Sequence, residues 1–381
     1  MGDMASSFEY GLNAAAKAYD GENKYIRITD IDDNTHKFLT DSLTSPDIDL
    51  TGADNYKLTE GDILFARTGA SVGKSYIYRN SDGLVYYAGF LIRARINEEY
   101  DKEFVFQNTL TDRYNKYIAV TSQRSGQPGV NAQEYAEFEI KVPKKEEQTK
   151  IGTYFRNLDH LITLHQRKCD ETKQLKKFML QKMFPKNGEK NPEIRFEGFT
   201  DDWEQRKLGD VFKEYSEKHH EELPALTIVQ GGGTIFREES DRSLQYDKSN
   251  LSGYKMVKKD DFIVHLRSFE GGLEKANSDG IISPAYHTMH GDNVDSRFYY
   301  PYFRSYDFIN RKLVAHVYGI RDGRSIDIDG MKSIEIPYTS YEEQKTIGDY
   351  LDSLDHLITL HQRKCEKLKE LKKFMLQNMF V

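Results

Sequence analysis

Two glycine-rich stretches are the first places where this sequence could carry chemistry. Residues 69–75 read GASVGKS, which is similar to a phosphate-binding loop but has three residues before Gly-Lys where that loop needs four. Ser75–Tyr78 also continues as a strand and does not open a helix. Two interpretations stay open: a turn whose amides and Lys74 approach a phosphate backbone, or a plain hairpin. The triplet Gly231–Gly233 precedes no helical pattern, which favours a flexible loop over a dinucleotide site.

The sequence does not predict catalysis. It contains no HExxH motif, no paired-cysteine zinc motif and no Asp/Asn-Pro-Pro-Tyr/Phe motif of a methyltransferase. His219–Glu222 form a polar cluster without metal-ligand spacing, which is typical of a solvated surface. We therefore predict a protein that is not an enzyme and has neither a metal site nor a cofactor of its own.

Basic and small polar residues gather where predicted strands end in both halves of the sequence. Arg, Gln, Asn and Ser side chains contact DNA phosphates and read base edges. Taken singly, each residue is more typical of an ordinary exposed position, so the interpretation rests on equivalent placement in the two halves. The DNA-binding candidates are Arg67, Thr68, Ser71, Lys74, Arg93, Arg124 and Gln127 in the first half and His265, Arg267, Ser268, Lys275, Arg321 and Arg324 in the second.

The elements that must position these residues are organised around a repeat. Residues 146–184 and 342–380 align at an offset of 196 positions and share 28 of 39 residues, and Leu158–Cys169 matches Leu354–Cys365 without a change. Each copy is rich in Leu, Lys, Gln and Glu, has no proline and has its glycine near the start. This composition predicts a helix roughly 60 Å long in each copy.

Apolar residues in each copy recur at alternating intervals of four and three, which is typical of a coiled-coil seam. In the second copy the predicted seam runs from Ile347 to Met379 and includes Leu371. Two near-identical amphipathic helices most economically bury their seams against each other, and two separate surface helices are the alternative. The predicted interface positions are Leu158, Ile162, His165, Leu354, Ile358 and His361.

Composition narrows the class of protein. The 381 residues carry a net charge of −7 and have a mean hydropathy of −0.72, and no apolar run is long enough to span a membrane. The start shows no signal peptide, so we expect a soluble cytoplasmic protein whose Cys169 and Cys365 are reduced thiols. The acidic balance argues against broad, non-specific adhesion to DNA but allows a local basic face.

The remaining sequence forms two sheet-rich blocks, which predicts an α+β protein with two globular domains and two long helices. The predicted segments are a domain at 1–145, a helix at 146–184, a linker at 185–202, a domain at 203–341 and a helix at 342–381. Weak similarity between Lys57–Arg67 and Met256–Arg267 indicates a tandem repeat. Predicted strands are Tyr25–Ile31, Asp62–Arg67, Ser75–Tyr78, Tyr86–Ile96, Phe138–Val142, Ala225–Val229, Asp261–Leu266, Gly280–Ser283 and Ile334–Ile336, with helices near Phe104–Tyr117 and Tyr302–Leu313.

The whole pattern resembles the specificity (S) subunit of Type I restriction–modification systems. The resemblance covers nearly the full chain. It is carried by GDILFARTGASVGKS at 61–75, the EEQ helix starts after Pro143 and Pro337, LDHLITLHQRK in both copies, and NPEIRFEGFTDDWEQRKLGD at 191–210.

This resemblance implies two target-recognition domains that each read one half of a split DNA target. The long helices would pack antiparallel as a coiled coil between the domains, set the half-site spacing and dock two methyltransferase subunits, with restriction subunits joining that core. S-adenosylmethionine, ATP and Mg²⁺ would then belong to the partner subunits of this adenine methyltransferase and endonuclease complex. The alternative from another class is a coiled-coil scaffold that binds protein partners without DNA specificity.

The first block departs from the pattern at its start. The second block opens with WEQRKLGDVF before its first strand, whereas the first block starts near FEYGLNAAAKAYDG without such a lead-in. The sequence therefore leaves open whether the first recognition domain is complete.

Overall fold

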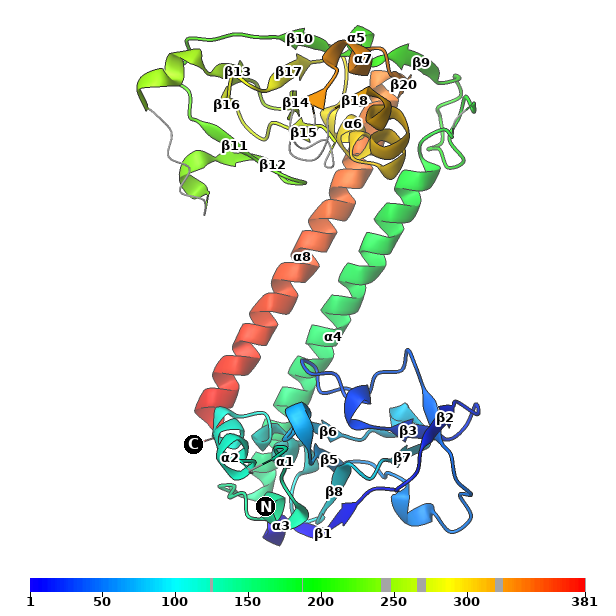
Figure 1. Ribbon diagram of the computed structural model, residues 1–381, viewed down its shortest axis with the longest axis vertical. Helices are drawn as coiled ribbons and strands as arrows, with labels where there is room; N and C mark the ends of the chain where they lie inside the picture. The colour runs from blue at the N-terminus through cyan, green and yellow to red at the C-terminus, as the bar shows by residue number, and fades with distance from the viewer. Residues whose placement is uncertain (124–125, 187, 241–247, 266–271, 319–324, 381) are drawn as a thin grey trace. The chain divides into compact units, whose positions relative to one another are not determined.

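A computed structural model describes the chain except for residues 124–125, 187, 241–247, 266–271, 319–324 and 381, and it divides into two compact units (Figure 1). Unit 1 comprises residues 1–166 and 362–381, and unit 2 comprises residues 167–361. Each long helix therefore contributes one part to each unit, whereas the sequence prediction treats each helix as a segment of its own.

Unit 1 is built on a four-stranded antiparallel sheet. β1 (Ala5–Tyr10), β8 (Leu91–Ile96), β5 (Ile63–Ala66) and β6 (Ser75–Ile77) lie in that order. Along β5, Ile63 and Phe65 belong to one buried cluster and Leu64 and Ala66 to another, because side chains alternate between the faces of a strand. Burial on both faces explains why this stretch reads as a continuous apolar run.

Shorter elements complete unit 1. The predicted strand at 86–96 divides into β7 (Val85–Tyr87) and β8 at a turn in which the Leu91 amide donates to the Ala88 carbonyl, 2.8 Å away. The single helix predicted near 104–117 is two helices, because the Thr111 side chain caps a new start at the Tyr114 amide. The other elements are β2 (Ala16–Ala18) paired with β4 (Thr44–Pro46), β3 (Lys24–Ile26) parallel to β7, α1 (Lys102–Asn108), α2 (Asp112–Thr121) and α3 (Ala132–Ala136).

Unit 2 repeats the main sheet of unit 1. β10 (Lys213–Tyr215), β17 (His287–His290), β14 (Phe262–Val264) and β15 (Glu274–Lys275) lie in the order that β1, β8, β5 and β6 have in unit 1. The helix predicted near 302–313 is the end of α6 (Ser296–Phe303) followed by a π-helical turn at Phe308–Lys312.

In the described residues of unit 2 the other strands form pairs, and two short α-helices lie among them. The pairs are β9 (Glu204–Lys207) with β20 (Glu335–Tyr338), β11 (Leu226–Val229) with β12 (Gly233–Phe236), β13 (Lys255–Val257) with β16 (Gly280–Ile282), and β18 (Val317–Tyr318) with β19 (Ser325–Ile326); the helices are α5 (Leu208–Val211) and α7 (Ile328–Lys332).

The repeated stretches form two long helices, α4 (Lys145–Lys182) and α8 (Tyr341–Met379). Within unit 1, the beginning of α4 packs against the end of α8, where Lys372 Nζ lies 2.7 Å from the Asp159 carboxylate. Within unit 2, the end of α4 packs against the beginning of α8 through the equivalent ion pair of Lys176 with Asp355, 2.5 Å. Each unit thus contains an antiparallel pair of helical segments.

Burial along the seam of α8 follows the predicted spacing except at Leu371. Leu158 and Leu354 are buried, whereas Leu371 is 39% exposed, so the seam prediction is wrong at that position. Leu371 follows Leu368 by three residues where the alternation of four and three requires four, and the residue at that spacing, Lys372, is half-buried. The other predicted interface residues, Ile162, His165, Ile358 and His361, are half-buried.

A buried glutamine explains the repeated EEQ helix start. Gln148 donates to the Pro143 carbonyl, 2.9 Å, and accepts from the Asp101 amide, 3.1 Å. Gln344 makes the same two bonds in unit 2, to the Thr339 carbonyl (2.7 Å) and from the Asp295 amide (3.0 Å). Because one primary amide both donates and accepts, it ties the entry of each long helix to the start of α1 or α6.

Candidate nucleic-acid interface

Arg67 lies directly after β5, between two exposed aromatic rings. Its guanidinium carbon is 5.0 Å from the centroid of Tyr10 and 5.8 Å from that of Phe90. Tyr10 is 43% exposed and Phe90 61% exposed, and they come from the end of β1 and from the turn between β7 and β8. The Arg67 Nε atom is buried and has no hydrogen-bond partner within the described part of the chain. We call these three residues the arginine–aromatic cluster.

The segment at 126–130 lies beside this cluster. The Gly69 amide donates to the Pro128 carbonyl, 3.0 Å, and the Val130 amide donates to the Arg67 carbonyl, 2.9 Å. Thr68 forms an isolated bridge with Gly129, and a Cβ added to Gly69 would come within 3.1 Å of Gln127 Nε2. The structure therefore brings together three predicted DNA-binding residues, Arg67, Thr68 and Gln127.

The cluster has the chemistry of a base-contacting surface. A guanidinium has five N–H donors in a plane, and it can pair with a guanine edge or a phosphate. Exposed aromatic rings can make apolar contact with a thymine methyl group in the major groove. Gln127 adds an exposed amide that can both donate and accept. Tyr10 and Phe90 are absent from the sequence-based candidates, because their exposure is visible only in the fold.

The stretch at 69–75 is a hairpin turn and not a phosphate loop. The amides of Val72, Gly73 and Lys74 bond to carbonyls of the same hairpin, which leaves them turned away from an external anion. Lys74 pairs with Asp33 and donates to the Ile31 carbonyl, 3.0 Å. Ser71 is half-buried in a 3-10 turn. Residues 69–73 also fit the letters Gly-x-Ser-x-Gly, but a nucleophile elbow joins a strand to a helix, whereas this turn joins β5 to β6.

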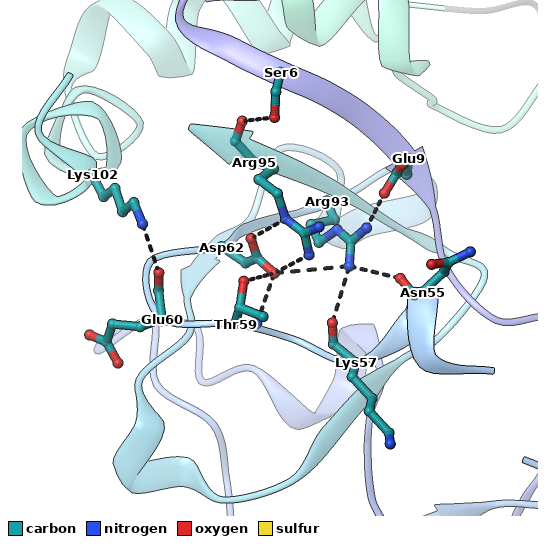
Figure 2. Close-up of polar contacts among 10 residues, drawn as sticks. All are labelled: Ser6, Glu9, Asn55, Lys57, Thr59, Glu60, Asp62, Arg93, Arg95 and Lys102. Carbon is teal, nitrogen blue, oxygen red and sulfur yellow. Dashed lines mark hydrogen bonds and ion pairs between the residues drawn. The ribbon is translucent and has the colours of Figure 1, made fainter. Parts of the chain in front are cut away.

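Arg93 belongs to the interior of unit 1 (Figure 2). Its side chain is 2% exposed, donates to the carbonyls of Asn55 (2.8 Å) and Lys57 (3.1 Å), and pairs with Glu9. Asp62 lies 3.9 Å from Arg93 and 3.2 Å from Arg95. A buried guanidinium needs acceptors of this kind. They contact its two terminal nitrogens, whereas Nε has no hydrogen-bond partner among the described residues. The prediction that Arg93 contacts DNA is therefore wrong: it faces inward from a central strand.

Unit 2 places two further candidates in internal contacts. The His265 ring, directly after β14, packs on Tyr286 with centroids 4.7 Å apart. Lys275 lies 2.9 Å from Asp260, which also accepts from Ser296, 2.9 Å. The remaining candidates, Arg124, Arg267, Ser268, Arg321 and Arg324, lie outside the described residues.

The glycine triplet forms a hairpin turn that is fixed by a buried carboxylate. The amides of Gly231 and Gly233 donate to Glu274, 2.9 and 3.2 Å away. Tyr300 donates to the same carboxylate, 2.8 Å, and Arg304 pairs with it. With its amides occupied in this way, the triplet is a structural turn, whereas the sequence favours a flexible loop.

Two further observations bear on function. Among the residues that the structure describes, no group of three or more His, Cys, Asp or Glu side chains is arranged to hold a metal ion. The described helices include none that combines the length and the apolar character needed to cross a membrane.

Comparisons with known proteins agree with this architecture. The family model "Type I restriction modification DNA specificity domain" matches twice, at residues 10–174 and 200–370. Two curated proteins from Methanocaldococcus jannaschii are similar along most of the chain. One is named the type I restriction enzyme MjaVIII specificity subunit and is 24% identical over 88% of this chain and 82% of its own. The other, assigned as the MjaX specificity subunit, is 25% identical over 84% of this chain and 77% of its own.

A solved structure shares the fold. It is the S subunit of a Type I restriction–modification system from M. genitalium, which superposes with a TM-score of 0.62 at 13% identity and covers 98% of this chain and 93% of its own. The chain belongs to the Type I restriction–modification DNA specificity family, with two copies of the family domain.

Proposed function

We propose that this chain is the non-catalytic DNA-specificity subunit of a Type I restriction–modification complex, and that each unit reads one half of a bipartite target. The observation that carries the proposal is the duplication: the family domain matches twice, and the two units repeat one sheet order. In unit 1, the arginine–aromatic cluster and Gln127 supply the surface for base contact. S-adenosylmethionine, ATP and Mg²⁺ belong in this proposal to cytoplasmic partner subunits.

The first experiment is methylation mapping of DNA from cells that express the adenine methyltransferase partner with and without this chain. The expected result is a methylated motif in two halves with a fixed spacer, present only with the chain. A motif with one half would assign recognition to a single unit. No change in methylation would favour a scaffold without DNA specificity and would contradict the proposal.

We also propose that α4 and α8 set the spacing of the half-sites and dock two methyltransferase subunits. Large exposed apolar residues recur on these helices at the repeat offset of 196, so each unit carries one complete set. The sets are Leu161, Leu371 and Phe374 in unit 1 and Leu357, Leu175 and Phe178 in unit 2. Exposed apolar residues of this size are typical of protein interfaces, and two equal sets suit two copies of one partner.

Single substitutions in each set test this docking. Phe374→Asp and Phe178→Asp should each lower the number of bound methyltransferase subunits from two to one, as measured by native mass spectrometry. Leu39→Asp, at a residue of unit 1 that is 43% exposed and lies off the helices, is the matched control. Two bound subunits in both Phe variants would place the docking surface elsewhere.

A further inference from the structure

Charged side chains continue the exposed apolar residues of each docking set along the same helix. In each unit, four exposed positions recur at intervals of three, four and three residues, which places them on one face of the helix. The unit 1 stripe lies on α8 and consists of Lys364, Lys367, Leu371 and Phe374. The unit 2 stripe lies on α4, at the repeat offset of 196, and consists of Lys168, Glu171, Leu175 and Phe178. The two stripes therefore differ at one position, where unit 1 has a lysine and unit 2 has a glutamate.

The surroundings of this position differ between the two stripes. In unit 2, Glu171 Oε1 lies 3.5 Å from Arg167 Nε, so its charge is compensated within the helix. In unit 1, Lys367 follows Arg363 by the same four residues, and like charges at this spacing repel each other. Both side chains are exposed, and neither forms an ion pair among the residues that the structure describes. A carboxylate supplied by a partner would relieve this repulsion.

The long helices as a whole differ in the same direction. The parts of α4 and α8 that belong to unit 1 carry nine basic and five acidic residues, whereas the parts that belong to unit 2 carry seven of each. Arg297 compensates some of this difference, since it pairs with Asp349, 2.5 Å, and lies 3.7 Å from Asp352. The helices of unit 1 remain the more positive, so they attract an acidic partner more strongly.

Lys168 and Lys364 indicate which chemistry a shared partner needs. They occupy the same position in the two stripes, are exposed, and form no ion pair within the described part of the chain. A partner that binds both stripes meets a leucine, a phenylalanine and this lysine each time. Complementarity therefore predicts an apolar partner surface with a carboxylate beside it.

We propose that a methyltransferase subunit with such an acidic docking surface binds the unit 1 stripe before the unit 2 stripe. Lys367 attracts the acidic surface, whereas Glu171 repels it. The inference rests on the proposed docking of methyltransferase subunits on α4 and α8. Assembly then passes through a complex with one methyltransferase subunit, which is bound at unit 1.

The test measures the affinity of each stripe alone. Phe178→Asp leaves the unit 1 stripe intact and Phe374→Asp leaves the unit 2 stripe intact, so isothermal titration of each variant with the methyltransferase subunit gives one dissociation constant per stripe. We expect binding to be about tenfold tighter at the unit 1 stripe, because a charge reversal replaces attraction by repulsion. Glu171→Lys in the Phe374→Asp chain should remove most of this difference. Lys367→Glu in the Phe178→Asp chain should weaken binding by about tenfold.

Asp170→Lys in the Phe374→Asp chain is the matched control. It makes the same change of charge as Glu171→Lys, one residue away but about 100° around the helix from that position. It should change the affinity far less than Glu171→Lys does. Raised salt should reduce the difference between the stripes, because exposed charges are screened.

Equal affinities of the two stripes, or tighter binding at the unit 2 stripe, would overturn the inference. A preference for unit 1 that persists after both charge reversals would also overturn it, because the charges would not be its cause. Two methyltransferase subunits bound to each Phe variant would overturn the proposed docking as well, so the two failures are distinguishable. Methylation mapping tests DNA recognition independently of these outcomes.

Discussion

Arg67 and Arg93 show what residue type can and cannot predict. The sequence analysis groups both arginines with residues at predicted strand ends and gives them the same interpretation. In the structure Arg67 follows β5 between two exposed rings, whereas Arg93 lies within β8 and is surrounded by carbonyls and carboxylates. Whether a residue on a strand faces inward or outward depends on the register in which that strand is paired. The register of β8 is set by its pairing with β1 and β5, and the sequence alone does not specify that pairing.

Replacing Arg67 should weaken base discrimination in one half-site. We expect Arg67→Ala to cost about 1–3 kcal/mol of discrimination at the half-site read by unit 1, without changing the other half. Arg67→Lys should restore salt-dependent affinity but not base preference, because it keeps the charge and loses the planar donor set. Competition binding with the assembled methyltransferase at fixed salt measures both effects.

Arg27→Ala, at an exposed arginine paired with Asp30, is the control for the loss of positive charge. Equal weakening on every DNA sequence would assign Arg67 to a phosphate contact.

Unit 1 should lose stability between neutral pH and mild acid because of His36. Burial lowers the pKa of His36, and the nearby Lys372 and Lys74 act in the same direction, whereas its hydrogen bond with the Ser75 carbonyl and the charge of Asp159 oppose the shift. The unfolded chain therefore takes up a proton below the ordinary pKa of about 6.5, while the folded chain resists it. Stability should fall as pH drops from 7 towards the lowered folded pKa.

Urea denaturation at several pH values measures this loss. His36→Asn is the matched variant, since asparagine stays neutral and tolerates the φ of 55° at this position. It should show a smaller loss of stability between pH 7 and 5. An identical pH dependence would remove His36 as a cause.

At the scale of elements, the long helices are the part that the sequence predicts best. Their repeat, spacing and missing prolines define α4 and α8 to within a few residues. The reason for the EEQ start is not predictable, because Gln148 and Gln344 act through residues about 50 positions upstream. The sequence also misses most of the short paired strands, since two- to four-residue strands depend on tertiary pairing more than on their own composition.

The glycines at the helix starts should respond unequally to alanine. A Cβ at Gly152 would lie 2.4 Å from Asp101 Oδ1 and 3.0 Å from Glu103 Cβ, whereas at Gly348 the nearest atoms are 3.2 Å away. Overpacking of this kind costs about 1–3 kcal/mol, and alanine gains about 1 kcal/mol of helix propensity. Gly152→Ala should therefore lower the free energy of unfolding more than Gly348→Ala. Urea denaturation of both variants measures the free energy of unfolding. A larger loss in Gly348→Ala than in Gly152→Ala would contradict this packing.

At the scale of the whole molecule, the fold is duplicated, and the proposed function requires two recognition domains. The family domain and the sheet order each occur twice, while the helices are near-identical and the domains are divergent. This contrast is expected where the helices share one task and the two domains recognise different bases. In the proposed function the base preference of unit 1 depends on side chains such as Tyr10 and Phe90, whose exposure is set by the fold.

Shortening both helices should change the spacer and not the half-sites. Deleting residues 160–166 and the equivalent 356–362 removes one heptad from each helix, or roughly 10 Å of length. We expect a methylated motif with unchanged half-sites and a spacer shorter by about three base pairs, at roughly 3.4 Å per base pair, or loss of assembly. Methylation mapping with native mass spectrometry distinguishes these outcomes. An assembled, active variant with the original spacer would contradict a spacing role for the helices.

Unit 1 is assembled from the first 166 and the last 20 residues of the sequence, with the 195 residues of unit 2 between them. During synthesis at about 5–20 residues per second, roughly 10–40 s separate its two portions. Throughout that interval Phe155 and Leu158, which pack with the end of α8 in the finished unit, have no α8 to cover them. We therefore expect unit 2 to fold before unit 1 on the ribosome. A chaperone that binds the nascent chain should bind the first half of α4 during this interval.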